Sequence, residues 1–208
     1  MGLNHPILDE SFAVIDQRVG AHSLSPQEYA LAQRLIHATA DFDYLHLLRV
    51  GAGAIPAALE ALGKGTPIVA DVTMTSQGIL GMVTKTFQNP VLTALDFAPE
   101  AEAGKTRTET GLLHCFAQYP SAVYVFGNAP TALLALCRQI ESLPPQAPRP
   151  PLIIGTPVGF ISVLEAKAAL ARLPVPQIAV EGNKGGSPAA AALVNALLVL
   201  AYTEISKV

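Results

Sequence analysis

The stretch SAVYVFGNAPTALLALCRQI, residues 121–140, decides the fold. It opens with a short apolar run over Ser121–Val125, passes through the turn Gly127–Thr131, and continues over Ala132–Ile140 with the composition of a helix. Continuous apolar strands are typical of a sheet that is covered on both faces. The stretch therefore predicts a strand–turn–helix unit of a parallel sheet.

Two further copies of this unit follow toward the C-terminus. Their strands, turns and helices are Leu152–Ile154, Gly155–Gly159 and Ser162–Arg172, and then Gln177–Val180, Gly182–Ser187 and Pro188–Tyr202. Three such units in succession are typical of a parallel sheet with crossover helices.

The N-terminal half is less regular but is compatible with the same architecture. We expect a helix over Pro56–Leu62 and buried strands over Pro67–Asp71 and Val91–Phe97. The proline-rich segment Pro144–Pro151 joins two units of the same pattern, so it is a stiff connector and no domain boundary. The sequence thus predicts one α/β domain over residues 1–208, with a three-layer, doubly wound and mostly parallel sheet.

Composition restricts the class of protein. Half of the 208 residues are hydrophobic and only 14% are charged, which is typical of a globular chain. The net charge is −3 and no basic run occurs, which argues against a nucleic-acid partner. Cys115 and Cys137 show no metal or redox spacing, and we expect both to be buried in a reduced, cytoplasmic protein.

No export or membrane segment is expected. Residues 1–6 lack the basic region and apolar run of an export signal. The most apolar segment, Ala189–Tyr202, is shorter than the ~20 residues of a membrane span and contains Asn195. This segment is predicted to be a buried core helix.

A well-marked helix start precedes the most charged part of the chain. Ser25–Glu28 has the pattern of a capping box with proline at the first helical position. Counting on from there, Leu31, Leu35 and Ala38 share one stripe, which we expect to face the core.

Arg34 and His37 are three residues apart on the flank of this helix. Imidazole moves protons near neutral pH, and a neighbouring guanidinium can hold an anion while lowering the imidazole pKa. The alternative is that His37 satisfies carbonyls at the helix end and Arg34 is merely solvated. A metal site of His37 with Asp41, Asp43 and His46 has no established ligand spacing, so no metal site is predicted.

The three glycine-rich turns are expected to meet at the carboxyl edge of the sheet, where ligands bind in such folds. Each turn places backbone N–H groups beside a helix N-terminus, which favours anions. Together they predict a polyanionic ligand, although any one of them could be no more than a tight turn. Neither the phosphate-binding nor the dinucleotide-binding glycine motif occurs.

Other polar residues leave two interpretations open. Asp71, at the end of a buried strand, is either a site residue or the cap of the next element. Arg107, beside Thr106 in a polar loop, is a carboxylate clamp or a solvated arginine. Ser11 precedes an apolar run and could simply cap a helix.

Sequence motifs from end to end carry a family resemblance. They are His5–Ile7, Glu10–Asp16, Arg34–Asp43, Asp71–Met74, Gly78–Ile79, Thr106–Arg107, Gly127–Leu133, Pro157–Phe160, Glu165, Lys167 and Lys184–Ser187. In their order and spacing the chain resembles the precorrin-8X (cobalt-precorrin-8) methylmutases of corrin-ring biosynthesis.

The resemblance implies an isomerase that moves a methyl group from C11 to C12 of the corrinoid, without a cofactor or external methyl donor. It implies that His37 is the catalytic acid/base, that Ser11 and Arg34 contact substrate, and that the protein is a homodimer with active sites near the subunit interface. The acidic arms of the corrinoid match the expected polyanion. The remaining expected contacts to it are Thr106, Arg107, Gly127, Asn128, Gly185, Gly186 and Ser187.

Two departures from the family pattern are visible. Glu109 and Thr110 stand where small residues are common, and Asn183 stands where many members have arginine. A non-catalytic tetrapyrrole-binding or carrier protein is therefore an alternative. A phosphosugar or nucleotide enzyme on a similar sheet is a further one, resting on the glycine turns only.

Overall fold

The structure is a computed structural model that describes residue 3 and residues 5–205. The N-terminal segment tested above for an export signal, and both ends of the predicted domain 1–208, therefore lie partly outside the described residues.

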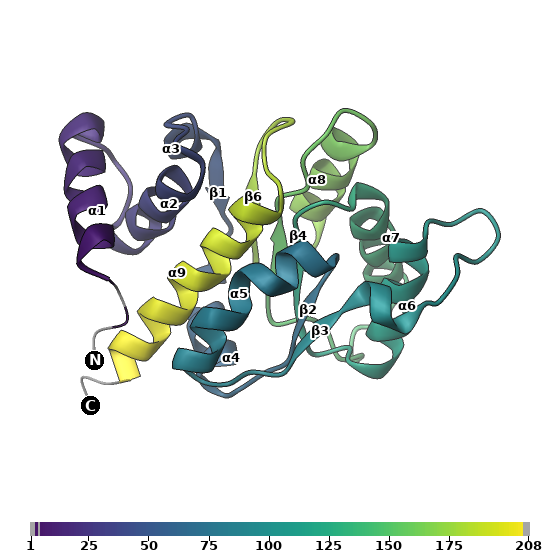
Figure 1. The fold of residues 1–208 in the computed structure, drawn as a ribbon. Helices are drawn as coiled ribbons and strands as arrows, with labels where there is room; N and C mark the ends of the chain where they lie inside the picture. Colours follow the sequence, from purple (N-terminus) through teal and green to yellow (C-terminus); the bar gives the residue numbers. More distant parts are fainter. Residues whose placement is uncertain (1–2, 4, 206–208) are drawn as a thin grey trace.

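Six strands form one sheet in the order β1–β6–β5–β4–β2–β3 (Figure 1). The strands are β1 (Leu48–Val50), β2 (Ile68–Ala70), β3 (Val91–Thr93), β4 (Val123–Phe126), β5 (Ile153–Gly155) and β6 (Gln177–Val180). Every neighbouring pair is parallel except β1 and β6, which run antiparallel. The predicted mostly parallel sheet is confirmed, while the antiparallel edge strand β1 was not foreseen.

Helices cover both faces of the sheet. They are α1 (Pro6–Val19), α2 (Pro26–Thr39), α3 (Tyr44–Leu47), α4 (Ala54–Gly63), α5 (Thr73–Lys85), α6 (Arg107–Gln118), α7 (Pro130–Glu141), α8 (Val163–Arg172) and α9 (Ser187–Ile205), with a 3₁₀ turn η1 (Ala94–Phe97). One core lies between the sheet and α1, α2, α4, α5 and α9; the other lies under α6, α7 and α8. The three-layer, doubly wound arrangement is confirmed.

Alternation along the central strand explains the two cores. Val123 and Val125 of β4 face the α9 side, whereas Tyr124 and Phe126 face the α7 side, and all four are buried. Because both faces are apolar, the strand has no alternation of polar residues in its sequence.

Two expectations fail locally. The strand predicted over Val91–Phe97 stops at Thr93, since residues 94–97 wind into η1. In α2 the capping box of Ser25 and Glu28 is present, but Ala38 is exposed, because this helix buries Ala32 and Ile36 beside its leucines.

Helix α9 is the central core helix. Its 19 residues are apolar and long enough to cross a membrane by length and composition alone. It packs instead against α2, α4 and α5, and a side chain at Gly78 of α5 would come within 2.7 Å of the Ala191 Cβ atom. Asn195, the polar interruption, donates from Nδ2 to the Gly78 carbonyl at 3.0 Å. The predicted core helix is confirmed and is slightly longer than expected.

The two cysteines are packing residues, as expected. Cys115 lies in α6 and Cys137 in α7, both free and buried, and burial raises the pKa of each thiol to about 12. Neither thiol is therefore a thiolate near neutral pH.

The strand order reverses between β2 and β4. From β2 the chain moves outward to β3, and from β4 it moves outward in the other direction through β5 to β6. The carboxyl ends of β2 and β4, at Asp71 and Gly127, meet at this reversal. Ligands of doubly wound proteins bind at such a point.

Candidate active site

Ser11, Arg34 and His37 come together where α1 packs against α2. The Ser11 Oγ atom lies 2.8 Å from Nδ1 of His37, and the Phe12 ring meets the imidazole edge-on with centroids 5.7 Å apart. Among the described residues, Nε2 of His37 has no hydrogen-bond partner. Ser11 lies within α1, whose N-cap is His5, so its alternative interpretation as a helix cap is wrong.

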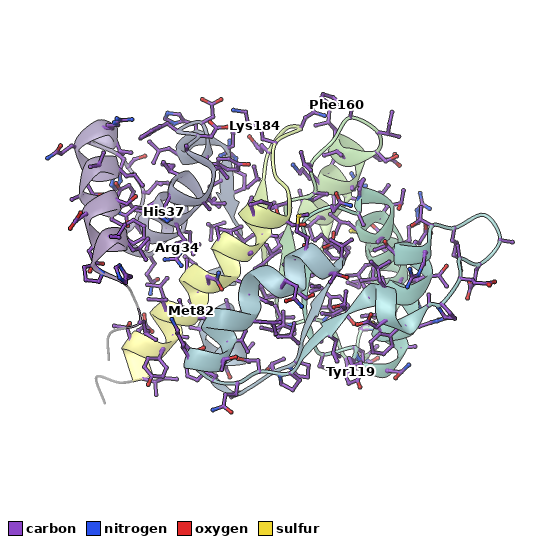
Figure 2. The ribbon with its side chains drawn as sticks, in the orientation of Figure 1. Arg34, His37, Met82, Tyr119, Phe160 and Lys184 are labelled. Atoms are coloured by element: carbon purple, nitrogen blue, oxygen red, sulfur yellow. The ribbon has the colours of Figure 1, made fainter. Side chains whose placement is uncertain are left out.

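Arg34 is a half-buried cation without a protein partner. Its side chain lines a hollow of about 70 Å³ with Phe12 of α1 and Val199 and Leu200 of α9. No hydrogen bond or ion pair joins its guanidinium to any residue in the described part of the chain. Figure 2 shows Arg34 and His37 near each other on α2. A buried charge without a partner is costly, so this guanidinium is suited to receive an anion.

The pair shifts the titration of the imidazole. Burial lowers the pKa of His37, and the adjacent Arg34 charge lowers it further. Burial also lowers the pKa of Arg34. The expected effect of the guanidinium on His37 thus has the predicted direction, although burial is the larger cause. Arg34 stays charged both below and above pH 7.

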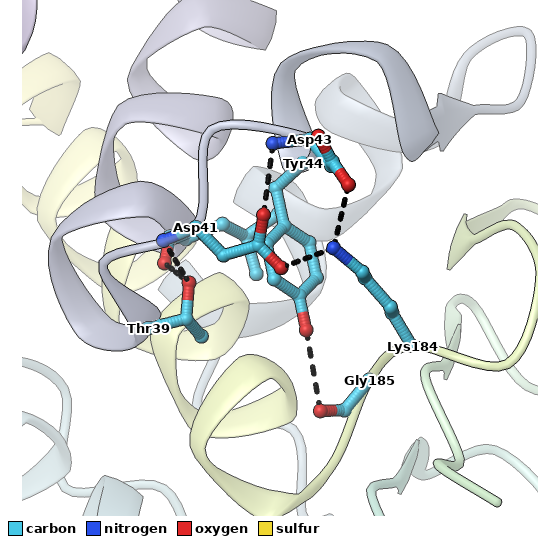
Figure 3. Close-up of polar contacts among 7 residues, drawn as sticks. Thr39, Asp41, Asp43, Tyr44, Lys184 and Gly185 are labelled. Atoms are coloured by element: carbon cyan, nitrogen blue, oxygen red, sulfur yellow. Dashed lines mark hydrogen bonds and ion pairs between the residues drawn. The ribbon is translucent and has the colours of Figure 1, made fainter.

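The carboxylates after α2 form a bridge to the last glycine turn. Lys184 Nζ lies 2.6 Å from both Asp41 Oδ2 and Asp43 Oδ2 (Figure 3). Tyr44 donates its hydroxyl to the Gly185 carbonyl at 3.3 Å in the same place. We name this set, Asp41, Asp43, Tyr44, Lys184 and Gly185, the α2 bridge. It ties the C-terminal end of the helix that carries His37 to the turn before α9.

Both aspartates of the bridge are paired with the same cation. The Lys184 ammonium lowers the pKa of Asp41. Within residues 5–205 no group of three or more histidine, cysteine, aspartate or glutamate side chains is placed to hold a metal ion. His46, which was also considered for a metal site, accepts a hydrogen bond from Arg49 on its backbone carbonyl.

Asp71 occupies the reversal point of the sheet. Its Oδ2 atom accepts the backbone N–H groups of Gly127, Asn128 and Ala129 at 3.0, 2.6 and 2.8 Å. Oδ1 accepts from the Val72 amide. The expectation that this turn offers free amides to a ligand is therefore wrong: an internal carboxylate already fills them. The Asn128 side chain is exposed.

The second and third glycine turns are joined to each other and to Asp71. Thr75 Oγ1 lies 3.0 Å from Asp71 Oδ1 and 2.9 Å from Ser187 Oγ. The Gly186 amide donates to the Thr156 carbonyl at 2.8 Å. A Cβ atom on Gly185 would stand 2.1 Å from that same carbonyl oxygen, so only glycine fits there. Polar contacts thus run along the whole carboxyl edge of the sheet.

Thr106 and Arg107 lie at the other end of this edge. Thr106 caps α6 rather than sitting in a loop, and its Oγ1 atom is 3.3 Å from that of Thr131 in α7. Arg107 donates to the carbonyls of Ala98 and Leu95 at 2.7 and 2.9 Å, so it is held by the end of η1. Arg107 is thus exposed but bound to the protein, and its role as a carboxylate clamp stays a prediction.

The departures from the family pattern have local roles. Glu109 is the third residue of α6, and its amide donates to Thr106 Oγ1. Thr110 is buried and binds the Glu102 amide. Asn183 donates from Nδ2 to the Gly159 carbonyl at 2.6 Å and joins the second and third turns.

The structure therefore gathers the predicted residues in two places. Ser11, Arg34 and His37 form one cluster at the α1–α2 end, and Thr106 and Arg107 lie at the α6 end, on the opposite side of the molecule in Figure 1. Sequence reasoning missed Tyr44 and Thr75, which bind the turn before α9 through contacts 141 and 112 residues apart. No local pattern marks such partners.

Comparisons with known proteins place the chain in one family. The precorrin-8X methylmutase family model matches residues 6–200. A cobalt-precorrin-8 methylmutase of Synechocystis sp. is 58% identical, with 97% of this chain and 98% of the relative covered. A precorrin-8X methylmutase of Pseudomonas aeruginosa is 38% identical over 92% of this chain and 93% of its own. A crystal structure of the precorrin-8X methylmutase from Thermus thermophilus is 41% identical and has a TM-score of 0.86, covering 96% of this chain and 99% of that one.

The fold and these relatives together define an α/β isomerase, a methylmutase of cobalamin biosynthesis. More specifically, the chain belongs to the precorrin-8X methylmutase family.

Proposed function

We propose that the chain moves a methyl group from C11 to C12 of precorrin-8X or cobalt-precorrin-8, giving hydrogenobyrinate or cobyrinate. The observation that carries this proposal is the cluster of a free imidazole edge and an unpaired, half-buried guanidinium at the α1–α2 end. The substrate class follows from the names of the relatives. No external methyl donor takes part, and all 208 residues act as one cytoplasmic domain.

His37 handles the proton in this scheme. The bond to Ser11 fixes the ring through Nδ1 and leaves Nε2 open. When Ser11 donates to Nδ1, the neutral ring carries its hydrogen on Nε2, ready for a nitrogen or carbon of the macrocycle. The lowered pKa of His37 favours this neutral form at pH 7. Positioning of one substrate conformer supplies much of the remaining rate.

The acidic arms of the corrinoid bind along the carboxyl edge of the sheet. Arg34 takes one arm, because its guanidinium has no competing acceptor among the described residues. The remaining proposed contacts are Ser11, Thr106, Arg107, Gly127, Asn128, Gly185, Gly186 and Ser187. Of these, Gly127 and Asn128 contribute shape and a side-chain amide, since Asp71 holds their backbone amides.

A homodimer would bring the two ends of this edge together. In one chain α2, which carries His37, and α6, which begins at Arg107, lie on opposite sides of the molecule (Figure 1). Phe160 and Ile161 are 90% and 82% exposed beside the edge, an apolar surface that a partner subunit would cover. Mixing inactive His37→Ala and Arg107→Met proteins tests this, since a shared site restores activity in mixed dimers. Light scattering that gives a monomer would refute the dimer.

Conversion itself is tested with a substrate labelled with ¹³C at the C11 methyl group. We expect the label to move to C12, with a changed visible spectrum and no added methyl donor. His37→Asn should bind pigment and fail to convert it, while the exposed His22→Asn should behave as the wild type. Tight binding by the wild type without any movement of the label would instead identify a carrier protein.

A further inference from the structure

Lys167 is a buried lysine without a carboxylate partner. It lies in α8, is 8% exposed, and no described carboxylate lies within 4.0 Å of its ammonium. Its Nζ donates instead to two backbone carbonyls, those of Gly182 and Lys184, each at 2.7 Å. Lysine is rarely buried in this way, because removing its charge from water is costly. The cost is reflected in a pKa that burial lowers to about 8.

Both carbonyls belong to the turn between β6 and α9. The carbonyl and the amide of one trans peptide point in opposite directions, and no described peptide bond is cis. When the ammonium turns the carbonyls of residues 182 and 184 inward, the amides of Asn183 and Gly185 must point away from it. Neither amide has an acceptor among the described residues. Gly185 and Gly186 permit this shape with φ of +151° and +111°.

We propose that Lys167 is a positioning residue of the methylmutase: it fixes the peptide planes so that the Asn183 and Gly185 amides receive one carboxylate arm of the corrinoid. The proposal rests on the proposed function and adds the residue that shapes this part of the site. Lys167 itself does not touch the substrate. Its charge acts through the two peptide groups, which present their hydrogen atoms on the far side.

The neighbouring cavity does not account for Lys167. A hollow of about 470 Å³ is lined by Lys167, Arg49, Gln177 and Glu181. Arg49 is paired with Glu181 and with the carbonyls of His46 and Leu48. Arg49 and Lys167 are both bound to protein atoms, so neither offers a free charge to a ligand in this hollow. The ammonium of Lys167 instead holds the turn between β6 and α9.

The test compares Lys167→Met, Lys167→Arg and Lys64→Met in steady-state assays. Lys64 is an exposed lysine at the C-cap of α4. Two substrates are used: the corrinoid with free acid arms and one with its arms converted to amides. In the wild type the amides should raise KM about tenfold, equal to about 1.4 kcal/mol. Lys167→Met should raise KM for the acid substrate by part of this factor and leave kcat within about twofold. Its response to the amides should be smaller than that of the wild type by the same part, and what remains is the loss of the carboxylate at Arg34.

A merely structural role would not produce this pattern. Lys167→Arg should recover most of the affinity, and Lys64→Met should match the wild type. Unchanged KM in Lys167→Met, or an equal response of both proteins to the amides, would overturn the proposal. If Lys167→Met does not fold by circular dichroism, Lys167→Arg and Lys167→Gln decide it by the same comparison. A wild type that binds pigment without converting it refutes the proposed function, and the ratio of the Kd values then judges Lys167 alone.

Discussion

Replacing Asp71 by asparagine should destabilise the whole carboxyl edge of the sheet. The carboxylate accepts three amides on Oδ2 and the Val72 amide on Oδ1, with Thr75 also on Oδ1. Asparagine keeps one oxygen, which the three amides of Gly127–Ala129 will claim. Its NH₂ group must then face the Val72 amide, so one donor meets another.

The magnitude follows from these bonds. Bonds to a charged acceptor contribute about 1.5–3 kcal/mol and neutral ones about 0.5–1.5, so three weakened bonds cost roughly 3 kcal/mol. The lost Val72 bond adds about 1 kcal/mol. Burial raises the pKa of Asp71, while the hydrogen bonds from the backbone amides lower it. Burying the charge is thus unfavourable, and its removal in asparagine offsets part of the lost hydrogen-bond energy. We expect the free energy of unfolding to fall by about 2–3 kcal/mol.

Urea unfolding at pH 7, followed by circular dichroism, measures this difference. Thr75→Val removes one bond on the same carboxylate and should cost about 1 kcal/mol. Asp9→Asn, on the exposed side of α1, should change stability by less than about 0.5 kcal/mol. If Asp71→Asn falls within the range of Asp9→Asn, the carboxyl group is neutral in the fold and does not hold the turn as a charged acceptor.

Three further predictions concern other parts of the molecule. Arg34→Met removes the second cause of the lowered His37 pKa, so NMR titration should show that pKa rising toward its usual 6.5. Because the lowered pKa makes protonation of His37 oppose folding, the folded state loses stability as pH falls below 6.5, and this loss should be smaller in the variant. Lys184→Met should raise the pKa of Asp41 toward its usual value, as carboxyl NMR would show, because the carboxylate loses the partner that makes it more acidic. Gly111→Ala places a Cβ atom 1.9 Å from a backbone carbonyl of η1 and should lower the free energy of unfolding by about 2–3 kcal/mol.

Matched variants separate these effects from general damage. Gly81→Ala also adds a methyl group to a helix, but nothing lies within 4 Å of it, so it should not destabilise. Lys64→Met removes an exposed ion pair on α4 and should leave the Asp41 titration unchanged. A His37 pKa that does not move in Arg34→Met would show that burial alone lowers it.

The local parts of the fold could be predicted from the sequence because their causes are local. The box of Ser25 and Glu28 sets the start of α2, and the spacing of three then places Arg34 beside His37. The strand–turn–helix units were visible because each buried strand is a continuous apolar run. Strand β1 was not predicted, since Arg49 interrupts the apolar run that marks the buried strands.

The contacts that complete the site are set by the fold as a whole. Asp71 reaches amides 56–58 residues away, and Lys184 reaches Asp41 across 143 residues. A glycine-rich turn has the same sequence whether its amides face a ligand or an internal carboxylate, so sequence could not show that Asp71 fills the first turn. The bonds of Arg107 could not be predicted for a similar reason: their acceptors lie in η1 and directly after it, where a strand was expected up to Phe97.

The cations near the site also differ in whether a protein acceptor already binds them. Arg49, Arg107 and Lys167 donate to protein carbonyls, and Lys184 is neutralised by two aspartates. Arg34 alone among these five has no acceptor in the described part of the chain, and it lies three residues from the imidazole. Because a buried guanidinium gains most from an anion that completes its hydrogen bonds, substrate binding should be strongest beside His37. The fold thus uses its other cations to shape the edge and leaves Arg34 free beside His37, where we propose that the proton is transferred.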